Sequence, residues 1–195
     1  TAKRLLNNGS SLILLFPYFS REFFETFQLC EIIMTSKYLD LISDPEAKEN
    51  VRLWLEGSFS QDEKNAVKDL IERSPKSAVD AFYKKLEFGT AGIRGIMGIG
   101  TNRLNRFTIR SAAQALSNYL KKTTNSPNPS VMIGYDSRIH SREFAEDAAR
   151  VFAANGIKSY LIKHLRPTPY LSFGMRLKKC DAGCMITASH NPKEY

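Results

Sequence analysis

Residues 131–138, VMIGYDSR, decide the fold, because a short apolar run ends there abruptly in polar and charged side chains. Val131–Tyr135 has the length and the continuous apolar character of a strand that is buried on both faces. Asp136, Ser137 and Arg138 follow it directly. The stretch therefore predicts a buried strand that delivers polar side chains at its carboxyl end.

Helices and strands alternate on both sides of this strand. In chain order, the sequence from residue 105 onward predicts a helix that Asn105 or Thr108 caps, the strand 131–135, a helix that Ser141 caps and Asn155-Gly156 ends, a strand over 158–164, a helix over 168–177 and a strand over 182–187. This alternation predicts an α/β fold with a mostly parallel, mixed sheet covered by helices. Ligands of such sheets bind beyond the carboxyl ends of the strands. The polar residues that follow 131–135 and 182–187 are therefore expected at the ligand edge.

The preceding residues 34–87 predict a helical preface to this fold. Asp44-Pro45 is typical of a helix start, and Ser60 caps a second helix after a break at Gly57-Ser58. A third, short helix is expected over about 77–85. Residues 1–33 carry an apolar stretch too short for a membrane span, which needs about 20 residues, and we expect an extension of doubtful origin that is poorly ordered. The expected organisation is thus 1–33, the preface 34–87 and an α/β domain over 88–195.

The positive charge of the chain is concentrated in its second half. The 195 residues carry a net charge of +8, and residues 88–195 contain sixteen basic and six acidic side chains, a difference of +10. Such a basic half favours nucleic acid, an anionic membrane or small phosphorylated molecules as a partner, unless an acidic segment packs against it. The three cysteines, Cys30, Cys180 and Cys184, suggest neither a disulfide framework nor a zinc site.

Residues 187–192, TASHNP, place a serine, a histidine and an asparagine directly after the last predicted strand. The hydroxyl of Ser189 can act as a nucleophile or a phosphate carrier where a cation neutralises the phosphate, and His190 can move protons. An ordinary Asx or Ser turn before Pro192 explains the same spacing. The segment lacks the G-x-S-x-G pattern of a nucleophile elbow, which disfavours acyl transfer.

Residues 88–95, FGTAGIRG, form a glycine-rich segment around Arg94. Its unshielded backbone N–H groups and forked guanidinium suit a phosphate, although a hairpin that needs glycine at positive φ has the same composition. The segment matches neither a P-loop nor a dinucleotide-binding fingerprint. In the 131–138 stretch, two roles stay open: Asp136 and Arg138 pair with each other, or Arg138 braces the serine segment from the neighbouring strand end.

Taken in order, these three segments resemble those of the α-D-phosphohexomutase superfamily, the phosphoglucomutases and phosphomannomutases. Their spacing is similar to that of the family's first α/β domain, and the resemblance covers about residues 35–195. The stretches VRLWL at 51–55, LEFGTAGIRGIMG at 86–98 and GTNR at 100–103 are most similar to the branch that contains phosphoglucomutase-2 and phosphopentomutase. The family's enzymes have four domains, so the resemblance implies that this chain is an N-terminal fragment, truncated at its C-terminal end and inactive alone.

The resemblance also implies the chemistry: an intramolecular phosphotransferase that interconverts a sugar 1-phosphate with glucose 6-phosphate or a pentose 5-phosphate through a sugar bisphosphate. Ser189 is then the phosphoserine, and His190 is a second catalytic residue. The residues implied for phosphate binding are Thr90, Arg94, Arg138 and Asn191. Ser189 is also the implied Mg²⁺ ligand, through its phosphate, because the family's D-x-D-x-[DN]-R metal segment does not occur in these residues. Glucose 1,6-bisphosphate is the implied activator.

Phosphorylated sugars are the expected partners, with no nucleic acid and no membrane, and the expected location is the cytoplasm. The oligomeric state stays open, as does the choice between hexose phosphate, pentose phosphate and sugar-bisphosphate synthesis. The alternative is a non-catalytic module that binds anions or nucleic acid through the basic half, 88–195, although no aromatic–basic stripe supports it. A phosphatase-like hydrolase is disfavoured, since it needs a water-activating metal cluster.

Overall fold

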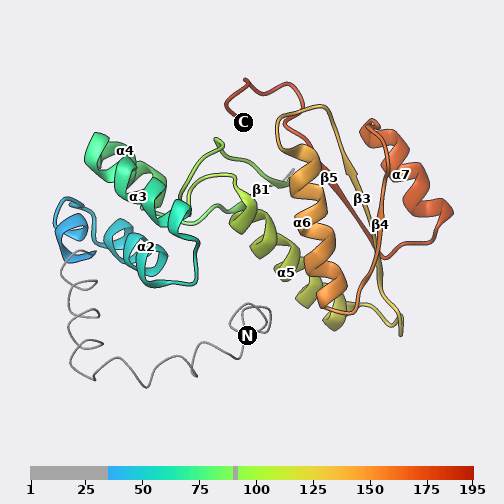
Figure 1. Ribbon diagram of the computed structural model, residues 1–195. Coiled ribbons are helices and arrows are strands. Elements are labelled where there is room, and N and C mark those ends of the chain that lie inside the picture. The colour runs from blue at the N-terminus through green and yellow to red at the C-terminus, as the bar shows by residue number, and fades with distance from the viewer. Residues whose placement is uncertain (1–34, 90–91) are drawn as a thin grey trace, which may run out of the picture.

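The computed structural model describes residues 35–89 and 92–195 (Figure 1). The predictions for residues 1–33 and for Thr90 lie outside these described residues. Within them, the helices α2–α4 lie at one end of the molecule, and a sheet with its covering helices lies at the other.

The preface consists of α2 (Pro45–Glu56), α3 (Gln61–Arg73) and α4 (Pro75–Phe82), after a helical turn over 35–39. Asp44 caps α2 as predicted, and its carboxylate accepts a hydrogen bond from the Ala47 N–H at 2.8 Å. Ser60 caps α3 as predicted, within a capping box. α4 begins before the predicted residue 77, because Ser74 caps it and a proline fits its first turn.

The hairpin between the preface and the sheet is built from β1 (Phe88–Gly89) and β2 (Gly92–Ile93), which pair antiparallel. Gly92 has a φ of 101°, a conformation that L side chains rarely adopt, and this explains a glycine at the turn. The hairpin forms a two-stranded sheet of its own and does not extend the main sheet.

The main sheet has the strand order β4-β3-β5, with both neighbours parallel to β3. Its strands are β3 (Ser130–Tyr135), β4 (Lys158–Leu161) and β5 (Ala182–Ile186), and its covering helices are α5 (Arg106–Thr123), α6 (Ser141–Ala154) and α7 (Thr168–Leu177). Val131 and Ile133 pack toward α5 and α6, whereas Met132 and Gly134 face α7 on the opposite side. The predicted α/β class, with a parallel sheet covered by helices, is confirmed.

Two hydrophobic cores stabilise the molecule. The first lies within the preface and includes Val51, Trp54, Val67, Ile71 and Phe82. The second lies between the sheet and the helices α5 and α6, and includes Ala113, Leu120, Val131, Ile133, Ala148 and Phe152. Phe107, at the start of α5, packs against the first core, with its ring centroid 5.2 Å from that of Trp54. Thus α5 reaches from one core into the other.

One predicted helix start is wrong. Ser141 does not cap α6; His140 occupies the cap position in a left-handed conformation, with a φ of 62° and no side-chain cap hydrogen bond. The Ser141 hydroxyl instead donates to Asp136 at 2.9 Å, because the end of β3 offers a carboxylate within its reach. Among the described residues, no helix is both long and apolar enough to cross a bilayer.

Candidate active site

The candidate site lies where the strand order of the sheet reverses. From β3 the chain runs through α6 to β4 on one side, and it returns through α7 to β5 on the other side. Such a reversal opens a crevice beyond the carboxyl ends of neighbouring strands, where α/β sheets bind ligands. The Asp136 N–H donates to the Ile186 carbonyl at 3.2 Å and joins these two strand ends. Sequence positions 136 and 187 are thereby brought together, as the strand pattern predicted.

Asp136 connects the end of β3 to Ser189 through a single intermediate, the hydroxyl of Thr187. Thr187 Oγ1 donates to Asp136 Oδ2 at 2.5 Å and accepts the Ser189 N–H at 2.9 Å. The other carboxylate oxygen accepts the Arg138 N–H and the Ser141 hydroxyl, both at 2.9 Å. Ser189 itself has a φ of 51°, in the left-handed region that costs a non-glycine residue free energy. These hydrogen bonds through Thr187, here called the Asp136–Thr187 bracket, therefore hold Ser189 in a strained turn.

The charge of Asp136 is stabilised by this bracket. Partial burial of the carboxylate acts to raise its pKa, but the hydrogen bonds from Thr187, the Arg138 N–H and Ser141, with the Arg138 charge, outweigh burial. The net effect is a pKa below the ordinary carboxyl value. Asp136 is accordingly an acceptor for its neighbours near neutral pH rather than a proton donor.

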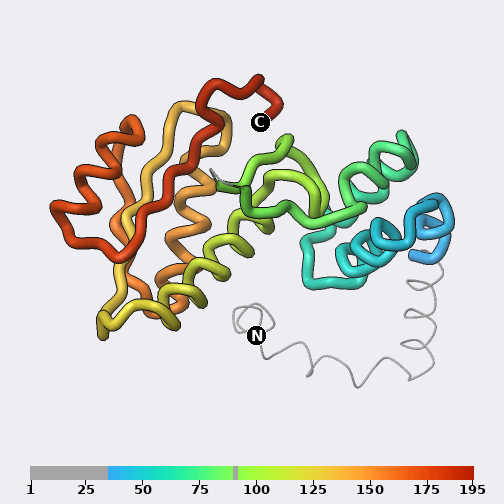
Figure 2. Tube along the Cα trace, turned by 180° about the vertical axis from the view of Figure 1, so that it is seen from behind, coloured from blue at the N-terminus to red at the C-terminus, as the bar shows by residue number. Residues whose placement is uncertain are grey.

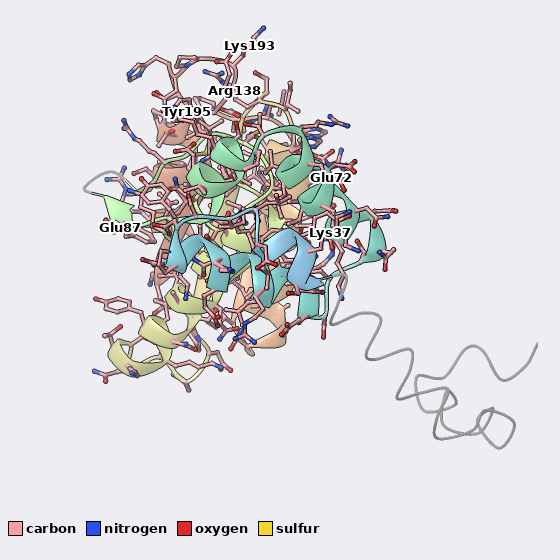
Figure 3. The ribbon with its side chains drawn as sticks, turned by 90° about the vertical axis from the view of Figure 1, so that its left-hand side faces the viewer. Lys37, Glu72, Glu87, Arg138, Lys193 and Tyr195 are labelled. Atoms are coloured by element: carbon pink, nitrogen blue, oxygen red, sulfur yellow. The ribbon has the colours of Figure 1, made fainter. Side chains whose placement is uncertain are left out.

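Arg138 braces the serine segment from the neighbouring strand end. Its Nη2 donates to the carbonyls of Ser189 at 2.9 Å and Asn191 at 2.6 Å, and its Nη1 donates to the Pro192 carbonyl at 3.4 Å. Figure 3 shows Arg138 at the same end of the molecule as the labelled C-terminal residues Lys193 and Tyr195. Of the two roles left open for Arg138, the structure has the brace.

Ser189 and His190 are both exposed, and their side chains meet. Ser189 Oγ lies 3.2 Å from His190 Nδ1, and the tautomer of the imidazole decides which atom donates. At this distance the imidazole can hold or return the hydroxyl proton. The backbone of Asn191 closes the turn, since its N–H donates to the Ala188 carbonyl at 2.9 Å.

Met97, two residues after the glycine-rich segment 88–95, contacts the chain just after the serine segment, and Arg94 does not. The Met97 N–H donates to the Glu194 carbonyl at 2.7 Å. Arg94 lines a separate cavity of about 550 Å³ beside the hairpin. Lys84, Gly89, Gly92 and Asn102 also line this cavity. Among the described residues no hydrogen bond joins Arg94 to Ser189, so phosphate binding by Arg94 stays a prediction.

A second hollow, lined by five basic and two acidic side chains, lies beside Arg138. It has a volume of about 430 Å³ and lies beyond the carboxyl ends of β3 and β4. Its basic lining residues are Arg138, His140, Arg142, Lys163 and His164. Except for Arg138, these residues were not predicted from the sequence, because they come from a loop, a helix and a strand end that only the fold brings together.

Three further basic side chains, Arg103, Arg106 and Arg110, form ion pairs within the fold. Arg106 and Arg110 on α5 pair with Asp147 on α6, at 3.4 and 2.6 Å. Arg103 pairs with Asp80 in the preface. Burial raises the pKa of the Cys184 thiol to about 11, so this cysteine is an inert core residue at neutral pH.

The described residues do not by themselves form a Mg²⁺ site. They contain no group of three or more His, Cys, Asp or Glu side chains that could hold a metal ion. The Asp136 carboxylate, which is linked to the serine turn through Thr187, already accepts three hydrogen bonds. A metal at Ser189 therefore needs ligands from outside these residues.

Comparison with known proteins identifies the family. Residues 85–195 match the family described as phosphoglucomutase/phosphomannomutase, alpha/beta/alpha domain I. The chain is 50% identical over 114 residues to the phosphoglucomutase of Staphylococcus haemolyticus (strain JCSC1435), covering 58% of this chain and 20% of that protein. It is 47% identical over 138 residues to the phosphoglucomutase of Staphylococcus aureus (strain USA300), covering 64% of this chain and 25% of that protein. The chain thus spans about a quarter or less of these relatives. By its α/β/α domain I, this chain belongs to the phosphoglucomutase/phosphomannomutase family.

Proposed function

We propose that Ser189 carries the phosphate of a phosphosugar mutase to which this chain contributes the first α/β domain. The observation that carries the proposal is the strained turn of Ser189 at the reversal of strand order, held by the Asp136–Thr187 bracket and by Arg138. Strain of this kind persists only where the surroundings over-determine it, and it clusters at functional sites. The relatives named phosphoglucomutase support the same assignment.

The reaction is a pair of reciprocal phosphoryl transfers. The free hydroxyl oxygen of a sugar monophosphate attacks the phosphorus of phosphoserine 189, the bond between phosphorus and Oγ breaks, and the sugar becomes a bisphosphate. The proton lost by the attacking hydroxyl is balanced by the proton that Oγ regains, and His190, 3.2 Å from Oγ, is placed to supply or accept it. The second transfer returns the other phosphate of the sugar to Ser189, so that serine and phosphate are conserved over one turnover.

Substrate phosphates would meet the basic side of this crevice. We assign phosphate binding to Thr90, Arg94, Arg138 and Asn191. The guanidinium of Arg138 already donates to three carbonyls of the serine segment. Its positive charge is therefore held at a fixed position relative to a phosphate on Ser189. Glucose phosphates or pentose phosphates are the proposed substrates, and glucose 1,6-bisphosphate is the proposed activator because it can restore the phosphoserine.

The activity needs more than these residues. Mg²⁺ is the proposed cofactor, with the Ser189 phosphate as one ligand and the remaining ligands from outside the described residues, which supply no metal cluster. The chain covers 20–25% of the relatives' length, which supports an incomplete active site that is inactive alone. The two separate cores support a division into a preface, 34–87, and the α/β domain, 88–195. A cytoplasmic location is part of the proposal.

Mass spectrometry tests the assignment on the chain itself. Incubation with glucose 1,6-bisphosphate and Mg²⁺ should add one phosphate, at Ser189, while glucose 1-phosphate is not converted to glucose 6-phosphate. Ser189→Ala should remain unmodified, and Ser172→Ala, which changes an exposed serine on α7, should behave like the parent chain. Phosphate on other serines with Ser189 unmodified would refute the carrier assignment, and turnover by these residues alone would refute the incomplete site.

A further inference from the structure

The preface is locked to the segment that follows the glycine-rich hairpin. The Thr101 hydroxyl donates to the Lys84 carbonyl at 2.7 Å, and the Asn102 N–H donates to the Ala81 carbonyl at 2.9 Å. Gly100 approaches the end of α4 so closely that a Cβ there would lie 2.3 Å from the Ala81 carbonyl oxygen. Residues 100–102 therefore have a fixed position relative to the preface.

Asn105 connects this fixed segment to the start of α5. Its Oδ1 accepts the N–H groups of Phe107 at 3.0 Å and Thr108 at 3.1 Å, which caps the helix. Its Nδ2 donates to the carbonyls of Gly98 and Gly100, both at 2.9 Å, and to that of Arg103 at 3.2 Å. The capping oxygen and the loop-binding nitrogen thus serve different elements, and one side chain holds both together.

The loop that Asn105 binds is hydrogen-bonded to the residues that directly follow the serine segment. The Gly98 N–H donates to the Leu104 carbonyl at 3.2 Å, and the Leu104 N–H donates to the Ile96 carbonyl at 2.9 Å. Between Ile96 and Gly98, the Met97 N–H donates to the Glu194 carbonyl at 2.7 Å. Figure 2 shows the C-terminal segment passing next to this loop, at the opposite end of the sheet from the α5–β3 connection.

The chain is therefore held at the serine turn and again just after it. The Asp136–Thr187 bracket and Arg138 hold the turn from the end of β3, and the Met97–Glu194 hydrogen bond holds the chain five residues after Ser189. The Met97–Glu194 hydrogen bond can fix the position of Glu194 only if Met97 itself has a fixed position. Asn105 Nδ2, through the Gly98 and Gly100 carbonyls, adds to the Leu104 backbone hydrogen bonds that fix the loop on which Met97 lies.

We infer that Asn105 is a positioning residue for the Ser189 turn, and that through it the helical preface sets the geometry of the phosphate-carrying serine. The inference rests on the proposed role of Ser189 for its functional meaning. Its structural content, a coupling from Asn105 to Ser189 through Met97 and Glu194, can be measured without any phosphate transfer.

Asn105→Ser distinguishes the capping role of the Asn105 side-chain oxygen from the loop-binding role of its nitrogen. Serine keeps an oxygen that caps α5, and it lacks the nitrogen that binds the loop. In ¹H–¹⁵N NMR spectra of the 195-residue chain, we expect the Met97 amide to exchange with solvent at least tenfold faster relative to the Ile133 amide in the sheet core. The amide resonances of Ser189 and His190 should shift in the same spectra. Asn105→Asp, which is nearly isosteric and also lacks the donor nitrogen, should show the same pattern.

Ser60→Ala is the matched control, because it removes a helix cap of α3 in the same preface without touching the loop. It should leave the Met97-to-Ile133 exchange ratio and the Ser189 and His190 resonances unchanged. The inference is overturned if a folded Asn105 variant leaves these signals where the parent chain has them, or if Ser60→Ala moves them equally. These outcomes are independent of phosphorylation, so they are distinct from a failure of the carrier assignment.

Discussion

At the scale of single residues, the position of Ser189 depends on two short side chains that do no chemistry. Thr187 transmits the position of Asp136 to the serine backbone through one hydroxyl, which donates on one side and accepts on the other. A turn with a non-glycine φ of 51° is disfavoured by itself, so each contact that selects it counts. Arg138 adds hydrogen bonds to backbone carbonyls of the turn. These bonds do not depend on the side chains of the residues that form the turn.

Thr187→Val tests the bracket. Valine keeps the shape of threonine but neither donates to Asp136 nor accepts the Ser189 N–H, so the turn loses its selected geometry. We expect the rate of Ser189 phosphorylation by glucose 1,6-bisphosphate to fall at least tenfold, with a loss of about 1 kcal/mol in the free energy of unfolding. Thr123→Val, whose hydroxyl bonds only within α5, should leave the rate unchanged. An equal rate in Thr187→Val and the parent chain would contradict the role of the bracket.

At the scale of elements, α5 and α6 are joined by an ion pair network around Asp147. The side chain of Asp147 is 5% exposed and accepts from Arg110 at 2.6 Å and Arg150 at 3.2 Å, with Arg106 at 3.4 Å. Burial acts to raise its pKa, but the hydrogen bonds and charges of Arg110 and Arg106 outweigh burial, and the net pKa is lowered. Because α5 and α6 pack against one face of the sheet, these ion pairs stabilise the packing against the central strand, β3.

The lowered pKa of Asp147 predicts acid sensitivity. A group whose pKa is lower in the folded chain stabilises it above its unfolded pKa, near 3.8, and that contribution is lost as pH falls through the folded pKa. Asp136 and Asp181 act in the same direction. Asp147→Asn should therefore lower the free energy of unfolding by about 1–2 kcal/mol at pH 7, because the arginines are partly solvated, and by less below pH 4.

Urea unfolding at several pH values measures this loss. Glu146→Gln, which removes more exposed pairs with Arg142 and Arg150, is the control and should cost less than about 0.5 kcal/mol at any pH. A loss in Asp147→Asn that is the same at pH 3 and pH 7 would show that the carboxylate charge does not contribute.

The junction of the preface with the glycine-rich loop is a second contact between elements, and Gly100 tests it. Gly100→Ala combines a strained φ of 126° with a Cβ 2.3 Å from the Ala81 carbonyl oxygen, and we expect a loss of more than about 2 kcal/mol in the free energy of unfolding. Gly156→Ala has a φ of 74° and open space around its Cβ, so it should lose only about 1 kcal/mol. Equal losses of stability in thermal or urea unfolding would contradict a rigid contact between Gly100 and the preface.

At the scale of the whole molecule, the fold was predictable where the sequence pattern is local. The apolar runs at 131–135 and 182–187 and the caps Asp44 and Ser60 predicted their elements, and the carboxyl-edge rule placed Asp136 near Ser189. The strand and cap signals depend on neighbouring residues, and the carboxyl-edge rule needs only the order of the predicted strands.

What escaped prediction depends on contacts between distant residues. The Thr187–Asp136 hydrogen bond joins positions 51 residues apart, and no spacing rule identifies it. Ser141 looked like a helix cap because the carboxylate that draws its hydroxyl away lies on the preceding strand end. The composition of 88–95 suited both a phosphate-binding loop and a hairpin, and only the structure shows two short strands that pair with each other outside the main sheet. The approach of Met97 to Glu194 likewise follows from tertiary packing alone.

The most direct test of the account supplies the rest of the enzyme. In a chimera, residues 34–195 of this chain replace the matching part of the phosphoglucomutase of Staphylococcus aureus (strain USA300), to which the chain is 47% identical over 138 residues. Circular dichroism and gel filtration confirm that each variant is folded, and conversion of glucose 1-phosphate to glucose 6-phosphate is then measured. We expect the chimera to turn over, and its Ser189→Ala variant to lose at least about a thousandfold in kcat, since no other group replaces a covalent carrier. A folded Ser189→Ala chimera that keeps the parent rate would contradict the central claim.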